Sequence, residues 1–134
     1  MTVIELFKAS ARTTVQKLWG VEYWLVNNDK YCWKLLQLNP GAQSSLHYHP
    51  IKDETFFVLV GDVYLETVSK GGLLLHTLLR PGDFRRLQPG RPHRFRAAFS
   101  TAFVLEVSTS HDDKDVVRLE ESRRISNESD STIS

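Results

Sequence analysis

Three histidines and one glutamate are spaced along the chain so that together they could bind a metal ion. His47 and His49 are separated by one residue, and Glu54 follows shortly after. Successive side chains of a strand point to opposite faces, so His47 and His49 would point the same way. His93 comes directly after the turn-rich segment Gln88-Pro89-Gly90-Arg91-Pro92. The spacing therefore predicts one site built from His47, His49, Glu54 and His93.

Imidazole nitrogens and a carboxylate oxygen form a borderline-hard set of ligands. Such a set suits one divalent transition metal (Zn, Mn, Fe, Ni or Co) rather than Ca or Mg. Four protein ligands leave an open position on a five- or six-coordinate ion, and a catalytic metal needs an open position. The alternative is that these side chains form a polar lining that holds no metal.

Short runs of β-forming residues surround the candidate ligands, and turn signals separate the runs. Many short strands with a turn every eight to twelve residues or so are typical of an all-β sandwich or barrel. Residues 5–16 could form a short helix or an ordered arm. The expected strands cover residues 22–27, 31–38, 54–60, 63–66, 73–79, 84–87 and 101–108.

Length and composition favour one cytoplasmic domain. The chain has 134 residues, enough to bury a core, and its 17 basic and 16 acidic residues nearly cancel. Nothing in that balance favours nucleic acid or a membrane surface as a partner. The single cysteine, Cys32, excludes an internal disulfide and fits a reducing compartment. No apolar run is long enough to span a membrane, and the amino end lacks the apolar core of a signal peptide.

Two motifs resemble the cupin superfamily. The first is Gly41-x5-His47-x-His49-x4-Glu54-x6-Gly61, which matches the first cupin motif at every defined position. The second runs from Gly82-Asp83 to Pro89-Gly90-Arg91-Pro92-His93, and it departs from the family where Gln88 replaces a usual proline and Ala97 a common asparagine. The resemblance implies a jelly roll, the double-stranded β-helix barrel of two facing sheets. We expect an N-terminal arm (1–21), a cupin barrel (22–124) and a polar, serine-rich, disordered tail (125–134).

A finer resemblance covers shorter pieces of the chain. Lys17-Leu-Trp-Gly-Val-Glu22, Lys34, Glu106-Val and Asp115-Val-Val-Arg118 are similar to the cupin domain of type II mannose-6-phosphate isomerases and to D-lyxose-isomerase-like cupins. This resemblance implies a metal-dependent isomerase or epimerase of sugars or sugar phosphates. The reaction would transfer a proton through a metal-stabilised enediol.

Three further residues are candidates for catalysis. Glu106 interrupts an apolar strand, so it either faces solvent in a salt bridge or lies inside the barrel with a raised pKa, where it could act as a general base. Glu22 is the other candidate base. Lys34 either lies on an exposed strand face or points into the barrel, where it could stabilise an anionic intermediate.

Basic residues could bind the phosphate end of a substrate, and the candidates are Lys17, Arg85 and Arg94. The alternative is that these residues form a solvated face. Two histidines fall outside the motifs: we expect His76 to be a surface or packing residue, and His111 to lie in a solvated loop.

Three functions stay open from the sequence. The first is the sugar isomerase. The second is a non-haem Fe(II) dioxygenase, which would have a more apolar cavity. The third is a non-enzymatic carbohydrate-binding or sensor protein, whose cavity would hold no titratable group besides the ligands. We also expect a homodimer, because small jelly rolls with apolar outer strands commonly pair.

Overall fold

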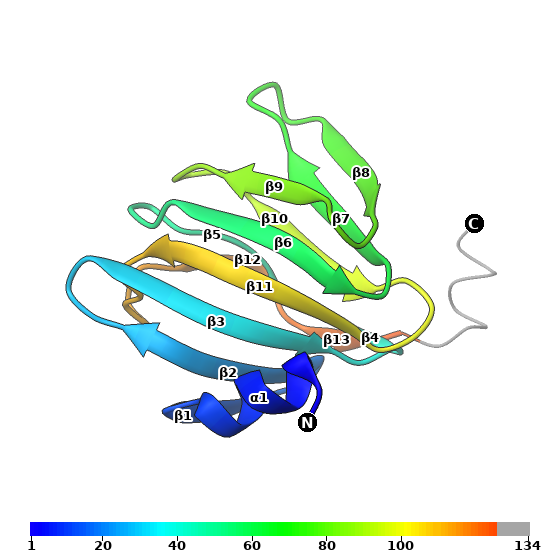
Figure 1. Cartoon of the computed structure of the whole chain (residues 1–134). Helices are drawn as coiled ribbons and strands as arrows, with labels where there is room; N and C mark the ends of the chain where they lie inside the picture. Colours follow the sequence, from blue (N-terminus) through cyan, green and yellow to red (C-terminus); the bar gives the residue numbers. More distant parts are fainter. Residues whose placement is uncertain (126–134) are drawn as a thin grey trace.

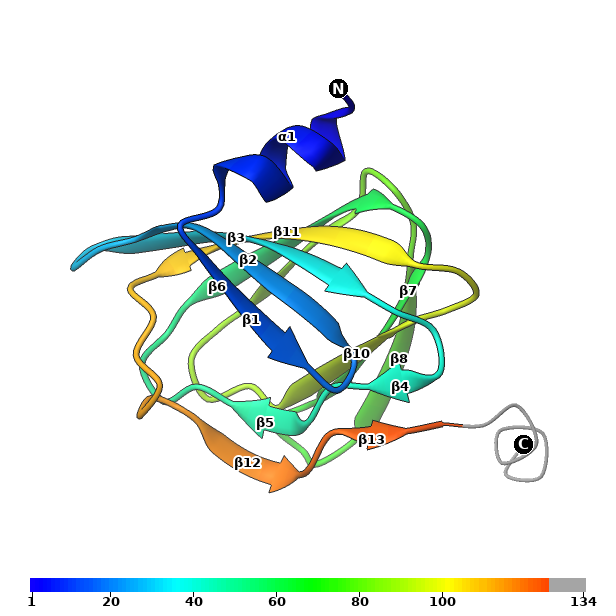
Figure 2. The ribbon, with the colours of Figure 1, turned by 90° about the horizontal axis from the view of Figure 1, so that it is seen from below.

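The computed structural model describes residues 1–125 and folds them into two facing β-sheets. The larger sheet has the strand order β1-β2-β3-β11-β6-β9, the smaller one the order β12-β5-β10-β7-β8, and β13 pairs with β4. Figures 1 and 2 show that the sheets enclose a common interior, as expected for a jelly roll. The elements are α1 (Val3–Ser10), β1 (Thr13–Lys17), β2 (Gly20–Asn27), β3 (Tyr31–Leu38), β4 (Ala42–Gln43), β5 (Leu46–Tyr48), β6 (Glu54–Val60), β7 (Val63–Val68), β8 (Leu74–Leu79), β9 (Phe84–Leu87), β10 (His93–Ala97), β11 (Ala102–Thr109), β12 (Val117–Glu120) and β13 (Arg123–Arg124).

The helix at the amino end is shorter than the segment expected from the sequence. Thr2 caps α1 through a capping box with Glu5, in which each side chain bonds the other residue's backbone N–H. The helix ends at Ser10, and residues 13–17 form β1, which pairs antiparallel with β2. The β-branched run Thr13-Thr14-Val15 explains this, since such side chains favour a strand over a helix. Helix α1 packs on the outside of the larger sheet.

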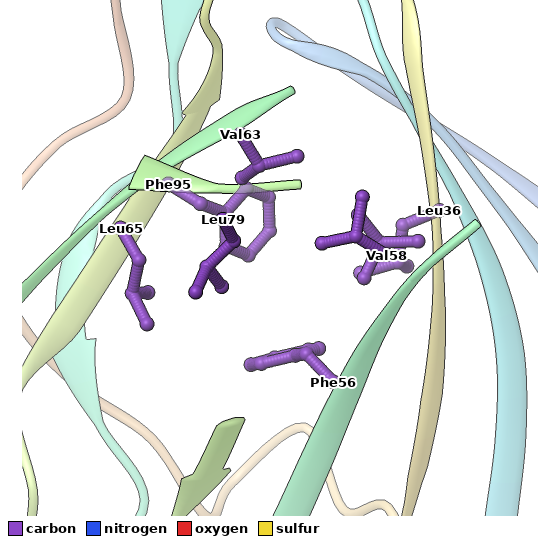
Figure 3. A pocket seen from close by; sticks show the side chains of 8 residues that line it. Leu36, Phe56, Val58, Val63, Leu65, Leu79 and Phe95 are labelled. Carbon is purple, nitrogen blue, oxygen red and sulfur yellow. The ribbon is translucent and has the colours of Figure 1, made fainter. Parts of the chain in front are cut away.

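Two kinds of packing divide the barrel interior. At one end apolar side chains from both sheets fill it: Leu36, Phe56, Val58, Val63, Leu65, Leu79, Phe95 and Val104 (Figure 3). All eight are buried and belong to one hydrophobic cluster. This end closes the barrel, and the other end is left open for a polar cavity.

The β6–β7 turn requires a glycine. Gly61 has φ +77°, and a Cβ atom at this position would lie 2.9 Å from the carbonyl oxygen of Thr101. Only glycine, which has no Cβ atom, therefore lets the end of β6 approach the start of β11 this closely. This glycine is also the last defined position of the first motif.

The carboxyl-terminal segment returns to the barrel after β11. Strand β12 pairs with β5, and the N–H of Ile125 donates to the carbonyl oxygen of Gly41 at 2.8 Å. The rest of the expected disordered tail, residues 126–134, lies outside the described residues. Within residues 1–125 no helix has the length and apolar character needed to cross a membrane.

Candidate metal centre

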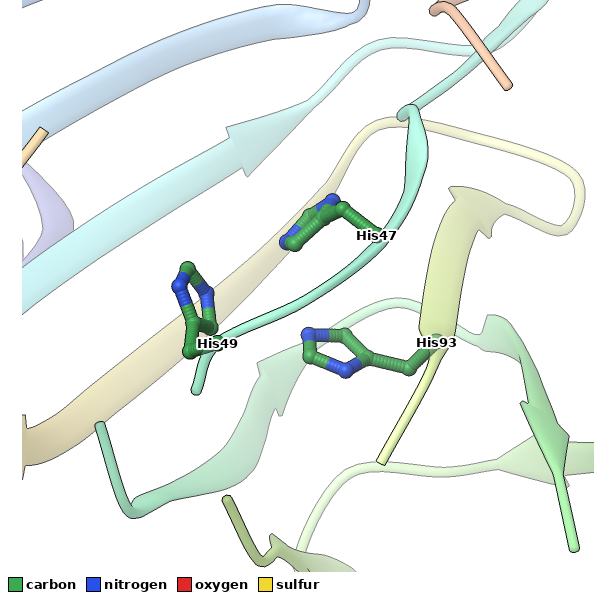
Figure 4. Close-up of side chains that lie close together, drawn as sticks. All are labelled: His47, His49 and His93. Atoms are coloured by element: carbon green, nitrogen blue, oxygen red, sulfur yellow. The ribbon is translucent and has the colours of Figure 1, made fainter. Parts of the chain in front are cut away.

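Three histidines converge inside the barrel, as the spacing predicts. His47 on β5 and His93 on β10 are direct cross-strand partners, and His49 follows β5. The ring centroids are 4.7 Å apart for His47 and His93, 5.0 Å for His47 and His49, and 5.9 Å for His49 and His93. One ring nitrogen from each lies within 4.8 Å of the others, and Figure 4 shows the three rings facing one another.

A backbone carbonyl fixes each ring. The Nδ1 atom of His47 lies 3.0 Å from the Ser45 oxygen, that of His49 2.7 Å from the Asp115 oxygen, and that of His93 2.9 Å from the Arg91 oxygen. A carbonyl oxygen only accepts, so Nδ1 carries the proton and Nε2 keeps its lone pair. This is the arrangement by which metal-binding histidines are commonly oriented.

Glu54 lies beside two of the three histidine rings. Its Oε2 atom lies 3.0 Å from Nε2 of His93 and 3.5 Å from Nε2 of His49. Among the described residues, neither Oε2 of Glu54 nor Nε2 of His93 makes a hydrogen bond, although both atoms are buried. Two facing lone pairs repel each other unless a cation lies beside them, so these buried atoms fit a divalent metal.

His47 is in the neutral form that binds metals. Burial and the neighbouring rings of His93 and His49 together lower the pKa of His47 to about 3. Neutral imidazoles and one carboxylate are a borderline donor set, as the sequence indicated.

A polar cavity of about 610 Å³ opens beside the histidines. The four candidate ligands line it, together with a group of charged side chains that includes Lys34, Lys52 and Glu106. The volume suits a small organic molecule. Because the cavity is charged, it differs from the apolar cavity expected for the dioxygenase alternative.

Glu106 lies inside the barrel, in an ion pair that the sequence did not reveal. Its Oε2 atom is 2.7 Å from Nζ of Lys52, and the two residues are only 5% and 3% exposed. Burial alone would raise the pKa of Glu106, but the ammonium groups of Lys52 and Lys34 outweigh it and lower the pKa to about 2. The interior position is confirmed, and the expected raised pKa is wrong because of these two lysines.

Lys52 also reaches the metal set. Its Nζ atom lies 3.6 Å from Oε1 of Glu54, and the carboxylates of Glu106 and Glu54 raise the pKa of Lys52 although burial opposes this. The sequence does not mark Lys52 as an interior residue, because it follows Pro50 in a segment typical of an exposed loop. Alternation gives no signal there, since residues 49–53 are not part of a strand.

A second group of charges lines the cavity around Lys34. This lysine is buried, and its Nζ atom lies 3.4 Å from Oε1 of Glu22 and 4.3 Å from the centre of the Trp24 ring. It donates to Nδ1 of His111 at 3.2 Å, and Nε2 of His111 donates to Asp113 at 2.7 Å. His111 therefore lines the cavity, and the expected solvated loop position is wrong. His111 reaches the cavity because the chain after β11 turns back across it.

Of the three basic residues expected to bind a phosphate, only Lys17 lines the cavity, where it lies 4.0 Å from Glu22. Arg94 alternates with His93 on β10 and faces outward, paired with Glu66 at 2.5 Å and Glu120 at 2.7 Å. Arg85 is exposed on the edge strand β9. The structure thus corrects the placement of both arginines. His76 is an exposed surface residue near Glu66, as expected.

Comparison with known proteins supports the fold. A family model for the cupin domain matches residues 34–108. A D-lyxose/D-mannose isomerase of Thermosediminibacter oceani is 33% identical over 111 residues, which cover 66% of this chain and 61% of the relative. A D-lyxose ketol-isomerase of a Thermofilum species is 32% identical over 114 residues, covering 68% of this chain and 63% of the relative. The chain thus spans about three fifths of the length of these curated relatives.

Solved structures agree on the fold. Oxalate decarboxylase of Bacillus subtilis has a TM-score of 0.72 at 20% identity, covering 80% of this chain and 30% of that chain. The formate complex of Lactobacillus farciminis oxalate decarboxylase also has a TM-score of 0.72, at 19% identity, covering 84% of this chain and 35% of that chain. At such identities the likeness shows the fold alone. A jelly-roll barrel with a histidine cluster in its cavity is suited to bind a divalent metal. The chain belongs to the cupin family.

Proposed function

We propose that this protein is a metal-dependent isomerase that interconverts an aldose and the corresponding ketose. The observation that carries the proposal is the buried ion pair of Glu106 and Lys52, which lies beside the histidine cluster and lines the same cavity. A carboxylate that accepts and returns a proton, and an ammonium group that donates a hydrogen bond to the developing oxyanion, are what a 1,2-proton shift beside a metal requires. The two curated relatives, both named as D-lyxose isomerases, support the same reaction class.

His47, His49, His93 and Glu54 would hold one divalent metal, with Mn, Zn, Fe, Ni and Co as the candidates. When bound, the metal supplies Lewis acidity that polarises the sugar carbonyl. The fixed Nδ1–H bonds of the three rings keep their Nε2 atoms aimed at one point, so the protein provides the site without a large rearrangement.

Glu106 is the general base in this proposal. Its carboxylate removes the proton from the carbon next to the carbonyl and returns it to the former carbonyl carbon, through an enediol. The proton of the neighbouring hydroxyl group passes to the former carbonyl oxygen in the same conversion. Lys52 donates a hydrogen bond to the oxygen on which negative charge develops, and Lys34 adds a second positive charge in the same cavity. Glu22, which lies 3.4 Å from Lys34, accepts hydrogen bonds from the hydroxyl groups of the substrate.

An uncharged sugar fits the cavity better than a sugar phosphate. The cavity is lined by four basic side chains, Lys17, Lys34, Lys52 and Arg118, and by five carboxylates, Glu22, Glu54, Glu106, Asp112 and Asp113, so it has no excess of positive charge for a phosphate. Arg85 and Arg94, which the sequence suggested for a phosphate, lie elsewhere. The printed names of the relatives point to D-lyxose and D-mannose as the first substrates to test.

The two alternatives have no specific support. The dioxygenase requires a more apolar cavity, and the non-enzymatic binder requires a cavity without titratable groups other than the ligands. Glu22, Lys34, Lys52 and Glu106 line the cavity, so neither expectation matches it.

Incubation with free sugars in D2O tests the proposal. Protein loaded with Mn2+ should convert D-lyxose or D-mannose to the ketose and incorporate deuterium from the solvent. Glu106→Gln should lower kcat by about 100-fold or more, the usual range for loss of a general base, while sugar binding is kept. The absence of ketose and of deuterium across a panel of aldoses and aldose phosphates would overturn the proposal.

A further inference from the structure

Asp115 is a buried aspartate on the segment between β11 and β12, beyond residue 108, where the match to the family model ends. Its carboxylate accepts two hydrogen bonds from consecutive backbone groups, Oδ1 from the N–H of Ile51 and Oδ2 from the N–H of Lys52, both at 2.9 Å. Both carboxylate oxygens are therefore used to hold the connection between β5 and β6.

The same residue also holds a candidate ligand. The backbone oxygen of Asp115 accepts from Nδ1 of His49 at 2.7 Å, although the two residues are 66 positions apart in the chain. Asp115 thus contacts the site on both sides of Pro50. Its carbonyl orients the ring of His49, and its carboxylate fixes the backbone from which the side chain of Lys52 leaves.

The connection between β5 and β6 needs the carboxylate of Asp115 because no neighbouring strand pairs with its backbone. Its side chains nevertheless point in opposite directions, as in a strand. Ile51 is 77% exposed, whereas Lys52 is buried and reaches Glu106. Residues 49–53 are not part of a strand, so the sheet ladders do not supply acceptors for their N–H groups. A carboxylate is a strong acceptor, and a buried N–H without a partner destabilises the fold.

We infer that Asp115 is a positioning residue of the active site, which sets the direction of the His49 ring and of the Lys52 side chain together. The inference rests on the proposed function, because Lys52 and the metal act in that reaction. It assigns a role in the site to a segment outside the two sequence motifs.

Asp115→Asn tests the inference, since the amide has nearly the same shape and keeps only one acceptor oxygen. The matched control is Asp83→Asn, because Asp83 also accepts a backbone N–H, from Arg80 at 2.8 Å, in an exposed turn far from the histidines. In Asp115→Asn we expect Mn2+ affinity, measured by calorimetry on chelator-stripped protein, to fall about 10-fold or more. The control should bind Mn2+ as the wild type does.

A second readout separates positioning from general destabilisation. At saturating Mn2+, kcat of Asp115→Asn should stay low with little change in KM, and Lys52→Met should then lower kcat less than it does in the wild-type background. Asp115→Glu, which keeps both acceptor oxygens, should recover part of the loss. Effects of Asp115→Asn and Lys52→Met that simply add would indicate independent sites and overturn the inference.

The outcomes distinguish the inference from the proposed function. If the wild-type protein binds Mn2+ and isomerises sugars, and Asp115→Asn does both within about twofold, the inference alone is overturned. If the wild type binds Mn2+ but isomerises no aldose, the proposed function fails, and the effect of Asp115→Asn on Mn2+ affinity still decides whether the Asp115 carboxylate holds the metal site in position.

Discussion

At the scale of single residues, alternation along a strand brings the candidate ligands together. The parity of His47 and His49 and the turn before His93 were sufficient to predict the cluster, because both features are local. Lys52 could not be predicted in the same way. Its burial depends on Asp115 and Glu106, which are far away in the sequence and reach it only in the folded barrel.

Lys52→Met tests the ion pair inside the cavity. Removal of the ammonium group leaves the buried carboxylate of Glu106 without its nearest partner, at 2.7 Å in the native protein. We expect the free energy of unfolding, measured in urea, to fall by about 3–5 kcal/mol. Lys70→Met, at an exposed position, should change it by less than about 0.5 kcal/mol.

The double variant Lys52→Met with Glu106→Gln gives a further check on the pair. It should be more stable than Lys52→Met alone, because no unpaired buried charge is left. Equal stability of the two variants would show that the charge of Glu106 is not what destabilises Lys52→Met.

At the scale of elements, strands with apolar runs were predictable and short polar strands were not. The seven expected strands correspond to β2, β3, β6, β7, β8, β9 and β11, each within about two residues of the observed ends. Strand β10 was missed because Arg94 and Arg96 dominate its composition, although its buried side chains alternate. Strands β4, β5, β12 and β13 have two to four residues, and only their partners make them strands.

Gly61→Ala tests the turn between β6 and β7. The new methyl group would meet the Thr101 oxygen at 2.9 Å, in a backbone with φ +77°. Gly72→Ala is the matched control, because Gly72 has φ +82° and nothing within 4 Å of a Cβ atom. Both variants carry about 1–2 kcal/mol of backbone strain, and Gly61→Ala adds about 1–3 kcal/mol from the contact.

Thermal or urea unfolding of the two alanine variants measures the difference. We expect Gly61→Ala to be the less stable one by at least about 1 kcal/mol. If Gly61→Ala and Gly72→Ala were destabilised equally, the turn would be able to move away from β11 without a loss of stability. The close approach would then not be a requirement of the fold.

At the scale of the whole molecule, the barrel is divided into an apolar end and a charged end. The strands β3, β6 and β10 contribute to both ends, as Leu36 and Lys34 of β3 show. Alternation indicates which residues of a strand share a face, but for Lys34 and Glu106 the sequence left open whether that face is the interior one. It did not predict how deep along the barrel each residue lies, because depth depends on the register between strands.

The outer surface bears on the proposed homodimer. On the larger sheet, Phe84 of β9 and Val107 of β11 are 64% and 57% exposed, and the Phe84 ring lies 5.4 Å from that of Phe57. Gel filtration with light scattering at micromolar concentration should give twice the chain mass of 15.4 kDa. Phe84→Glu should shift the protein toward the monomer, and a wild-type monomer would contradict the homodimer.

In the proposed function, His47, His49, Glu54 and His93 together hold one divalent metal. Elemental analysis of protein purified without chelators tests it most directly, with His93→Gln and the exposed His76→Gln compared side by side. We predict about one transition-metal ion per chain in the wild type and in His76→Gln, and almost none in His93→Gln. Equal metal content in all three proteins, or none in the wild type even after incubation with Mn2+, Zn2+, Fe2+, Ni2+ and Co2+, would contradict the account.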